Sequence, residues 1–419
     1  MGVKSGYKQT EVGVIPEDWE VKQLVELAKV RSGIAKNSNK TISNPVLVHY
    51  LRVANVQDGY LDLFEMSMIE VNREDITRYA VLPGDVLMNE GGDLDKLGRG
   101  SIWHGEFTPC IHQNHVFVVR CGSQLAPDYL NVWTGTAPSR RYFLVAGKQT
   151  TNLASINKTA LGQLPVGLPS TKVEQEAIAE VLSDADGLIE SLEQLLAKKR
   201  HLKQGAMQEL LTGKKRLLGF SGEWEVKRLG ELGGFLKGSG VTKDQAMSGS
   251  LACVRYGEIY TRHTDYIKAF YSWISRDVAT TATRLKYGDI LFAGSGETKE
   301  EIGKCVTFAD DVEAYAGGDI VILRNEKADP LFLGYYLNTV PINRQKASRG
   351  QGDAVVHISG VALAAIQGMF PSLPEQTAIA AILSDMDGEI AALEAKLAKA
   401  RSLKQGMMQE LLTGRIRLV

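Results

Sequence analysis

Long apolar runs and cysteine pairs are missing from this sequence of 419 residues. No stretch of about 18 apolar residues occurs, so the sequence predicts no transmembrane helix. The N-terminal segment has no apolar core of the kind that a secretory signal needs, so we expect a cytoplasmic protein. The cysteines lie far apart without a C-x-x-C pair, which argues against a zinc ribbon or a disulfide framework; they are Cys110, Cys121, Cys253 and Cys305.

An excess of charge of either sign is missing as well. The sequence holds 48 lysines and arginines against 49 aspartates and glutamates, for a net charge of -1. Nucleic-acid-binding domains often show a basic excess, but a basic cleft can be balanced by acidic surfaces elsewhere on the molecule. The net charge therefore leaves nucleic-acid binding open.

The motifs of several enzyme classes are incomplete. Residues 296–305 (GETKEEIGKC) have the wrong spacing for a phosphate-binding loop and lack a hydroxyl residue after Lys304. Asn44 and Pro45 are followed by Val46 rather than by the rest of the Asn-Pro-Pro-aromatic loop that methyltransferases of exocyclic amines use. We therefore expect neither an ATPase nor a methyltransferase in this chain.

Two polar clusters are candidates for metal binding. Asp85 with Asp93, Asp95 and Lys96 resembles a loose nuclease site, but the stretch is typical of a polar loop. Cys110, His112 and His115 lie close together without an evident fourth ligand, so a polar loop that leads into a strand is the favoured interpretation. We expect no metal site in this chain.

An internal repeat determines the expected architecture. Residues 174–217 and 375–418 align at a constant offset of 201, and 30 of 44 positions are identical. Helix-favouring residues dominate both copies. Their apolar positions alternate three and four residues apart, which predicts a heptad seam that two helices of one chain can bury against each other. The seam positions are Leu182, Ala185, Ile189, Leu192 and Leu196 in the first copy and Leu383, Met386, Ile390, Leu393 and Leu397 in the second.

Glycines punctuate both helical segments. Gly213 and Gly414 follow the last Leu-Leu-Thr and are expected to end the helices. Gly205 and Gly406 lie inside the pattern, where glycine costs about 1 kcal/mol against alanine, so they are expected to mark a close helix approach or a kink.

A weaker repeat flanks the helices. Residues 19–22 (WEVK) match residues 224–227, residues 83–87 (PGDVL) match 287–291 (YGDIL), and residues 115–120 (HVFVVR) match 319–324 (DIVILR). The sequence therefore predicts two related globular segments, residues 1–170 and 218–372, each followed by a helical segment, residues 171–217 and 373–419. Between these anchors the two globular segments differ almost everywhere, so we expect a shared fold and different targets.

Each globular segment mixes strand and helix signals, which predicts an α/β (α+β) fold with long loops. Strands are expected at Val116–Arg120, Ala252–Tyr256 and Ile320–Arg324, and helices near Pro127–Gly135 and Pro330–Asn338.

The N-terminal pattern Pro16, Trp19, Glu20, Val21 and Leu24 resembles that of the specificity subunits of type I restriction–modification systems. The repeated helices, with E-Q-x-x-I-A and L-K-Q-G-x-M-Q-E-L-L-T-G, resemble the two conserved spacer regions of that family. The resemblance covers essentially the whole chain in the family's usual order. One departure is that the second copy (FSGEWEVKRL) lacks the proline of the first.

The resemblance implies a non-catalytic DNA-binding subunit. Each globular segment would be a target recognition domain that reads one half of a bipartite, asymmetric site in double-stranded DNA. The spacer helices would pair as an antiparallel coiled coil that acts as a ruler. Two modification (methyltransferase) subunits and ATP-dependent endonuclease (restriction) subunits would be the partners, and these would bind S-adenosylmethionine, ATP and magnesium, with no cofactor in this chain.

The expected length of the helical segments is consistent with their acting as a ruler for the DNA spacer. The heptad-bearing part, about residues 182–211, would extend roughly 45 Å at 1.5 Å per residue, which is on the order of 13 base pairs of DNA. The basic runs at residues 198–200 and 214–216 could contact the spacer DNA, but we interpret them as solvated faces or as contacts to an acidic partner.

Base reading needs hydrogen-bond donors and acceptors on loops, with Arg to guanine and Asn or Gln to adenine as the usual pairs. Residues 147–156 (GKQTTNLASI) and 349–358 (RGQGDAVVHI) lie at equivalent places before the helices and are the best candidate reading loops. The candidate readers are Arg31, Arg52, Asn55, Asn89, Lys148, Gln149, Thr150 and Asn152 in the first segment and Lys237, Arg255, Tyr256, Thr298, Lys299, Arg349, Gln351 and His357 in the second. Many contacts would go to phosphate and carry no sequence information.

Two other function classes stay open at this point. One is an enzyme, a fused nuclease or methyltransferase, which the activity of the purified chain with added cofactors would reveal. The other is a scaffold protein that joins partners through its helices and reads no DNA, which selection from random-sequence duplexes would distinguish from a reader.

Overall fold

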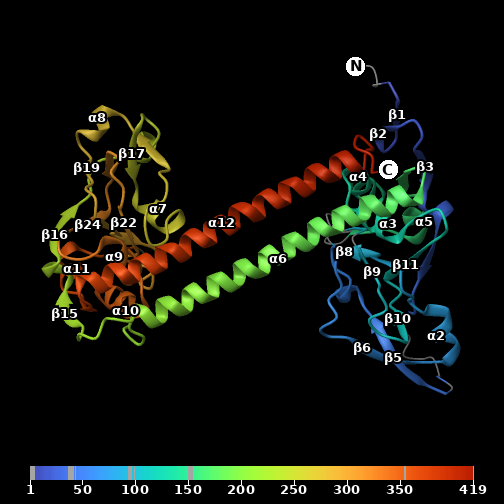
Figure 1. Cartoon of the computed structure of the whole chain (residues 1–419), viewed down its shortest axis with the longest axis horizontal. Coiled ribbons are helices and arrows are strands. Elements are labelled where there is room, and N and C mark those ends of the chain that lie inside the picture. Colours follow the sequence, from blue (N-terminus) through green and yellow to red (C-terminus); the bar gives the residue numbers. More distant parts are fainter. Residues whose placement is uncertain are drawn as a thin grey trace. The chain divides into compact units, whose positions relative to one another are not determined.

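The computed structural model describes residues 5–35, 42, 44–92, 97, 98, 100–149, 154–352 and 355–418. The chain forms two compact units, and each is described by itself. Unit 1 consists of residues 1–193 and 396–419, and unit 2 consists of residues 194–395. Both contain part of each of the two long helices, α6 (Lys172–Leu210) and α12 (Leu373–Leu411), which are drawn in green and red in Figure 1.

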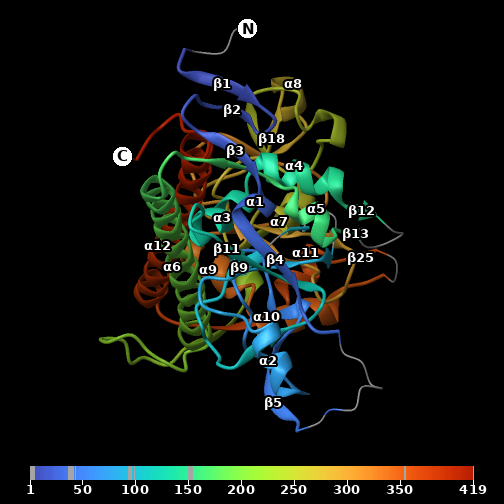
Figure 2. The same ribbon diagram turned by 90° about the vertical axis from the view of Figure 1, so that its right-hand side faces the viewer.

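Unit 1 is built on a four-stranded antiparallel sheet in the order β4-β11-β7-β9. Beside it lies a three-stranded sheet in the order β10-β5-β6, in which β5 and β10 run parallel. Figure 2 faces unit 1 and labels β4, β9 and β11 of the first sheet and β5 of the second. The strands of the two sheets are β4 (Ala28–Ser32), β5 (Val46–Leu51), β6 (Ser67–Val71), β7 (Val86–Asn89), β9 (Gly100–Ile102), β10 (Cys110–His112) and β11 (Val116–Cys121).

Smaller elements complete unit 1. The short strands are β1 (Tyr7–Thr10), β2 (Gly13–Pro16), β3 (Glu20–Gln23), β8 (Gly91–Gly92), β12 (Lys148–Gln149), β13 (Ala154–Ser155) and β14 (Pro165–Leu168). The helices are α1 (Leu24–Leu27), α2 (Arg73–Tyr79), α3 (Pro127–Thr134), α4 (Ala137–Ala146) and α5 (Lys158–Gly162). The helix predicted near Pro127–Gly135 is therefore confirmed as α3.

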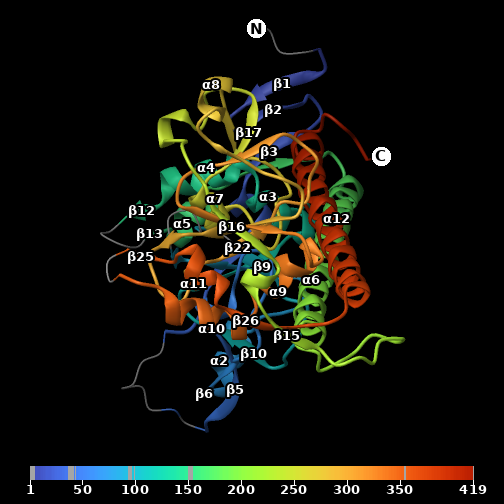
Figure 3. The same ribbon diagram turned by 90° about the vertical axis from the view of Figure 1, so that its left-hand side faces the viewer.

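Unit 2 repeats this plan (Figure 3). Its four-stranded sheet has the order β16-β24-β20-β22, and its second sheet, β18-β17-β23-β19, again contains one parallel pair, β17 with β23. The strands are β15 (Glu225–Arg228), β16 (Gly233–Lys237), β17 (Leu251–Val254), β18 (Ser272–Ile274), β19 (Thr283–Arg284), β20 (Asp289–Ala293), β21 (Ser295–Gly296), β22 (Cys305–Thr307), β23 (Ala314–Ala316), β24 (Ile320–Asn325), β25 (Val356–His357) and β26 (Gln367–Phe370). The helices are α7 (Tyr256–Thr261), α8 (Arg276–Ala279), α9 (Pro330–Tyr336), α10 (Val340–Arg349) and α11 (Gly360–Ala364).

One expected strand is shorter than predicted. The run Ala252–Tyr256 was expected to be extended throughout, but β17 ends at Val254 and Tyr256 begins α7. The carboxylate of Glu258 accepts a hydrogen bond from the Arg255 backbone N–H at 3.1 Å, which caps the helix at this point.

The repeated Gly-Asp and strand-end Arg anchors form the same buried ion pair in both units. Asp85 accepts two 2.7 Å hydrogen bonds from Arg120. Asp289 accepts bonds of 3.1 and 2.9 Å from Arg324. Both carboxylates are buried, so each pair replaces the water that its carboxylate has lost. The pairing of Asp85 with Arg120 also supports the interpretation that this aspartate is structural rather than part of a nuclease site; Asp93, Asp95 and Lys96 lie outside the described residues.

The long helices contribute directly to the cores of both units. Ile178 and Leu182 of α6 and Leu411 of α12 belong to the core of unit 1. Leu210 of α6 and Leu383 of α12 belong to the core of unit 2. The ends of the helices are therefore integral parts of the globular folds rather than separate appendages.

Within each unit the two helices run antiparallel, as the ion pairs between them show. In unit 1, Lys404 binds Asp186 and Arg401 binds Glu193 at 2.5 Å. The matching pairs in unit 2, offset by 201 residues, are Lys203 with Asp387 at 2.8 Å and Arg200 with Glu394 at 2.7 Å.

The seam positions lie on the inward side of the helices. Leu182, Leu196, Leu383 and Leu397 are buried. The remaining members are half-buried; they are Ala185, Ile189, Leu192, Met386, Ile390 and Leu393.

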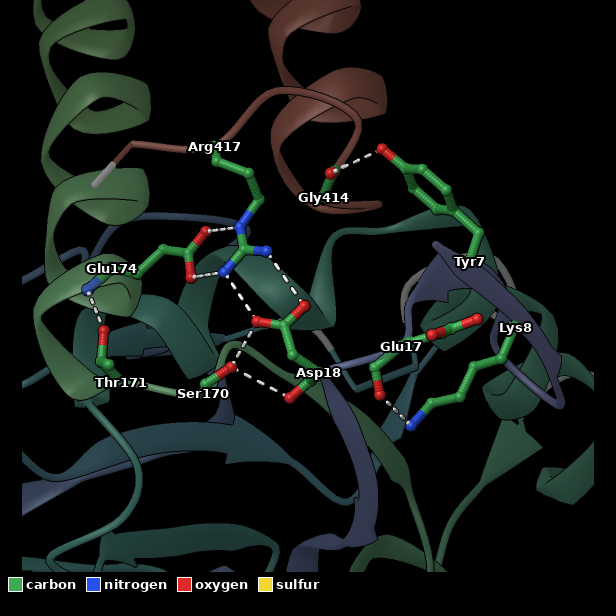
Figure 4. A network of polar contacts seen from close by, with 9 residues as sticks. All are labelled: Tyr7, Lys8, Glu17, Asp18, Ser170, Thr171, Glu174, Gly414 and Arg417. Carbon is green, nitrogen blue, oxygen red and sulfur yellow. Dashed lines mark hydrogen bonds and ion pairs between the residues drawn. The ribbon is translucent and has the colours of Figure 1, made fainter. Parts of the chain in front are cut away.

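The last residues of the chain fasten α12 and α6 to the globular part of unit 1 (Figure 4). The Arg417 guanidinium donates two hydrogen bonds to the fully buried carboxylate of Glu174 and two of 3.0 Å to Asp18. The Ser170 hydroxyl donates to Asp18 at 2.6 Å, and the Tyr7 hydroxyl donates to the Gly414 carbonyl at 3.2 Å. We call this network the Arg417 latch.

Unit 2 has a matching contact. Arg216 donates two hydrogen bonds of 2.6 Å to the buried carboxylate of Glu375. Both arginines also lie over a tryptophan ring, Arg417 at 5.8 Å from the centre of Trp19 and Arg216 at 5.9 Å from that of Trp224. The two latches therefore follow the same plan.

The helix glycines behave in two ways. Gly213 and Gly414 have φ angles of 69° and 64°, so both adopt the left-handed conformation that ends a helix, as predicted. A Cβ atom at Gly205 or Gly406 would meet nothing within 4 Å. The expectation of a close approach there is wrong, because both glycines face open space on continuous helices.

Candidate nucleic-acid interface

A cleft of about 480 Å³ opens on one face of unit 2. Four of the predicted reading residues line it, Lys237, Arg349, Gln351 and His357. They come from the end of β16, the end of α10 and the bridge that leads into β25. The fold therefore brings together side chains that lie up to 120 residues apart in the sequence.

Main-chain pairing holds the cleft's reading segment in place. Gln351 and His357 exchange two backbone hydrogen bonds, of 2.9 and 2.8 Å, and His357 also pairs with Ser295 of β21. The Ser295 hydroxyl lies 2.9 Å from the His357 ring nitrogen Nδ1. Both Gln351 and His357 have exposed side chains on a fixed backbone, which is the arrangement that directional recognition of a ligand needs.

The cleft also contains three polar residues that the sequence did not single out as readers, Ser295, Asp319 and Ser359. Asp319 is exposed and has a φ angle of 58°, which is uncommon for a residue other than glycine. Its carbonyl accepts a hydrogen bond of 2.7 Å from the Gly294 N–H. The sequence contained a signal, because Asp319 begins the repeated segment that starts with His115 in the first copy.

The other predicted readers of unit 2 do not line this cleft. Arg255 and Tyr256 lie at the start of α7, and Thr298 and Lys299 lie in the exposed turns after β21. As base or phosphate contacts these four residues stay predictions.

The equivalent reading segment of unit 1 occupies the same place in the fold. Lys148 and Gln149 form β12, which pairs with β13, and β13 pairs with β8. In unit 2 the matching strands are β25 and β21. Lys148 is exposed, whereas Thr150 and Asn152 lie outside the described residues.

Asn55 and Asn89 are engaged inside unit 1. The buried Asn55 amide donates to the carbonyls of Asp62 at 2.8 Å and Glu65 at 3.3 Å. The Asn89 amide donates to the Val56 carbonyl at 2.8 Å. These bonds hold the loop that follows β5, so the structure gives both amides a structural role where the sequence suggested base reading.

The two arginines among the predicted readers of unit 1 also bond to main-chain carbonyls. Arg31 of β4 donates to the Arg78 carbonyl. Arg52 donates to the Glu65 carbonyl at 3.4 Å. Each guanidinium therefore uses one of its hydrogen-bond donors for a main-chain carbonyl, and both side chains are half-buried.

The cysteine–histidine group does not form a metal site. Among the described residues no cluster of three or more His, Cys, Asp or Glu side chains could hold an ion. Cys110 and His112 are buried in β10, and the His112 ring nitrogen Nδ1 lies 2.6 Å from the Val116 carbonyl. Burial lowers the pKa of His112 to about 4 and raises the pKa of Cys110 to about 12, so both stay neutral near pH 7.

Within the described part of the chain, no helix is both long enough and apolar enough to cross a bilayer.

Comparison with known proteins adds a family model and several relatives. The model of the type I restriction modification DNA specificity domain matches residues 221–400. The chain is 28% identical over 437 residues to the putative type I restriction enzyme MjaX specificity subunit of Methanocaldococcus jannaschii, with 99% of this chain and 97% of that protein covered. It is 23% identical over 428 residues to the type I restriction enzyme MjaVIII specificity subunit of the same organism, with 96% and 94% covered.

Solved structures share the fold at low identity. The S subunit of a type I restriction-modification system from M. genitalium aligns with a TM-score of 0.59 and 13% identity, covering 98% of each chain. A chain from a structure of the assembly and conformational transition of the type I R-M system aligns with a TM-score of 0.52 and 15% identity, covering 96% of this chain and 99% of that one. The predicted fold class, two α/β domains with a coiled coil, is therefore confirmed.

Proposed function

The family model, the curated relatives and the shared fold indicate a specificity subunit of a type I restriction–modification system, and on that premise we propose that each unit reads one half of a bipartite, asymmetric DNA site. Such a subunit is a non-catalytic recognition subunit. Its task is to choose the site at which partner subunits act.

The contrast between the two units carries this proposal. The sheets β4-β11-β7-β9 of unit 1 and β16-β24-β20-β22 of unit 2 have equivalent strand orders and carry the same buried aspartate–arginine anchor. The exposed side chains at matching places differ, with Lys148 on β12 of unit 1 and Gln351 and His357 around β25 of unit 2. A common scaffold with different exposed donors and acceptors is what two readers of different half-sites require.

The helices support a symmetric set of partners. They carry matching ion pairs at an offset of 201 residues, and 30 of 44 positions are identical in the two copies, so the two helices offer related surfaces. We infer that two modification subunits dock on these two equivalent surfaces and that ATP-dependent endonuclease subunits join them. In this proposal S-adenosylmethionine, ATP and magnesium are bound by the partners, and this chain binds double-stranded DNA.

The test is a selection of DNA by the full chain together with its methyltransferase subunits from a pool of random duplexes. We expect enrichment of a split motif with two fixed half-sites and an unread spacer. In a second chain, residues 218–372 are replaced by the equivalent segment of a relative, while residues 171–217 and 373–419 are kept as the control. One half-site should change and the other should stay the same; no split motif, or a change in both halves, contradicts the proposal.

A second experiment addresses the spacer. One extra heptad is inserted in each helix, after Glu193 and after Ala395, which preserves the seam. Seven residues add about 10.5 Å of helix, or roughly three base pairs. The spacer should lengthen by about that amount while both half-sites stay unchanged, and an unchanged spacer would show that the helices do not set it.

A further inference from the structure

A turn in unit 1 carries a chain of polar side chains that neither the fold nor the reading loops explain. Asn114 and His115 lie between β10 and β11, just before the first residue of β11 in the four-stranded sheet. The Glu90 carboxylate, just after β7, lies 2.6 Å from the His115 ring nitrogen Nδ1. The Asn114 amide nitrogen lies 3.2 Å from the other ring nitrogen, Nε2.

The geometry assigns one direction to this chain of hydrogen bonds. An ionised Glu90 can only accept, so Nδ1 of His115 carries the proton and donates it to the carboxylate. In the neutral ring Nε2 is then an acceptor, and it takes one N–H of the Asn114 amide. The second amide N–H and the carbonyl oxygen of Asn114 are left as a donor beside an acceptor.

The turn does not need these side chains to keep its shape. The Asn114 N–H donates to the Ile34 carbonyl at 3.0 Å, the Val116 N–H donates to Gln113 at 2.9 Å, and the Glu90 N–H donates to the His115 carbonyl at 2.9 Å. In unit 2 the matching turn keeps the last of these bonds with Gly318 and Asp319 in place of Asn114 and His115. The hydrogen-bonded side chains of Glu90, His115 and Asn114, which we call the relay, are therefore an addition to an already fixed backbone.

The relay lies beside the reading segment. The Glu90 carbonyl accepts a hydrogen bond of 2.8 Å from Ile156, directly after β13, and β13 pairs with the strand that bears Lys148. At the matching position of unit 2, Asp319 lines the cleft with Arg349 and Gln351. The His115 side chain is 56% exposed and that of Glu90 is 29% exposed, so the carboxylate is the more shielded member of the pair.

We propose that Asn114 reads an adenine in the half-site of unit 1, with His115 and Glu90 as positioning residues. This rests on the proposed function and names a contact within it. A donor beside an acceptor matches N7 and N6 of adenine in the major groove, whereas guanine presents two acceptors there. Asp319, the counterpart of His115, can only accept and so suits an exocyclic amine such as cytosine N4, which gives the two halves different preferences.

The test uses the full chain with its methyltransferase subunits and the same selection from random duplexes. Asn114→Ala should lower the preference for adenine at one base pair of one half-site by roughly 5- to 150-fold. Asn114→Asp, which has acceptors only, should shift that position toward cytosine. An Asn131→Asp control makes the same change on α3 of the same unit and should leave every position unchanged.

The positioning residues give a separate readout. His115→Phe removes both ring nitrogens and should weaken the preference at the same base pair alone, as should Glu90→Ala. Glu90→Gln keeps an oxygen acceptor for the His115 Nδ1–H and should retain the preference. Melting curves establish that each variant is folded.

The outcomes separate the two proposals. If the unmodified chain enriches no split motif, the proposed function fails. If it enriches one and Asn114→Asp leaves every base preference intact, or changes several positions in both half-sites, the assignment of Asn114 is overturned while the proposed function stands.

Discussion

Removing the guanidinium of the Arg417 latch is expected to destabilise unit 1 far more than removing its neighbouring arginine. In an Arg417→Met variant the Glu174 carboxylate, which is fully buried, loses the partner that donates two hydrogen bonds to it. Breaking a buried ion pair by removing one partner costs about 3–5 kcal/mol. Because the Arg417 side chain is 31% exposed, water can reach part of the site, so we expect the lower end, about 3 kcal/mol.

Loss of the ion pair between Arg417 and Asp18 adds little to the destabilisation of unit 1. The Asp18 side chain is 51% exposed, and exposed pairs contribute about 0.2–1 kcal/mol. The matched control is Arg415→Met, two residues away in the same tail, because Arg415 pairs with Glu410 at 3.2 Å on the exposed surface. That variant should lose less than about 1 kcal/mol.

Hydrogen exchange is the appropriate assay, because the chain has two units and a single unfolding midpoint is not well defined. Amide protection in the first turns of α6 and in β3 and β14 reports the local free energy of opening. It should fall by about 3 kcal/mol in Arg417→Met and hardly change in Arg415→Met. A double variant, Glu174→Met with Arg417→Met, removes the unpaired charge and should recover much of the loss. Equal losses for the two arginines, or no recovery in the double variant, would refute this reasoning.

Two further predictions concern single residues. His112 has a pKa of about 4 in the fold against 6.5 unfolded, so the stability that its neutral ring contributes is complete above pH 6.5 and is lost as the pH falls toward 4. The free energy of unfolding of unit 1 should therefore be lower at pH 4 than at pH 7 by roughly 3 kcal/mol from this source. A His112→Asn variant that keeps the full pH dependence would contradict the assignment. Gly414→Ala should destabilise its unit more than Gly213→Ala does, since both glycines need left-handed φ angles but a Cβ at Gly414 would lie 2.4 Å from Pro16 Cγ, whereas at Gly213 the nearest atom is Trp224 Cε2 at 3.4 Å. Hydrogen exchange of each unit measures the two losses, and equal losses would show that the packing difference has no consequence.

The long helices and the repeated anchors could be predicted from the sequence because their causes are local or recur. Heptad spacing places Leu182 and Leu383 on an inward stripe, and both are fully buried in the structure. The recurring Gly-Asp and strand-end Arg signals marked Asp85 and Arg120 without revealing that they bond to each other. The recurrence of a residue at a fixed offset indicates that the fold needs it. Only the pairing of the strands shows that Asp85 and Arg120 are partners.

The residues of the candidate interface could be predicted only in part, because they are assembled by tertiary structure. Lys237 and His357 come from strands that are distant in sequence, and Arg349 comes from the end of α10. The relay of Glu90 and His115 joins residues 25 positions apart and exists because β7 pairs with β11. Asn55 looked like a base reader by residue type alone, whereas its burial depends on a loop whose path the sequence does not specify.

The composition of unit 1 has a consequence for synthesis on the ribosome. Its core includes Leu411 and Leu412, and its latch includes Arg417, so residues from both ends of the chain are needed to complete it. Unit 2 is made entirely of residues 194–395, so all of its residues are synthesised before residues 396–419, which complete unit 1. The first unit to be started is therefore the last to be completed. A message truncated near its 3′ end yields a chain in which unit 2 has all its residues and unit 1 lacks the Arg417 latch.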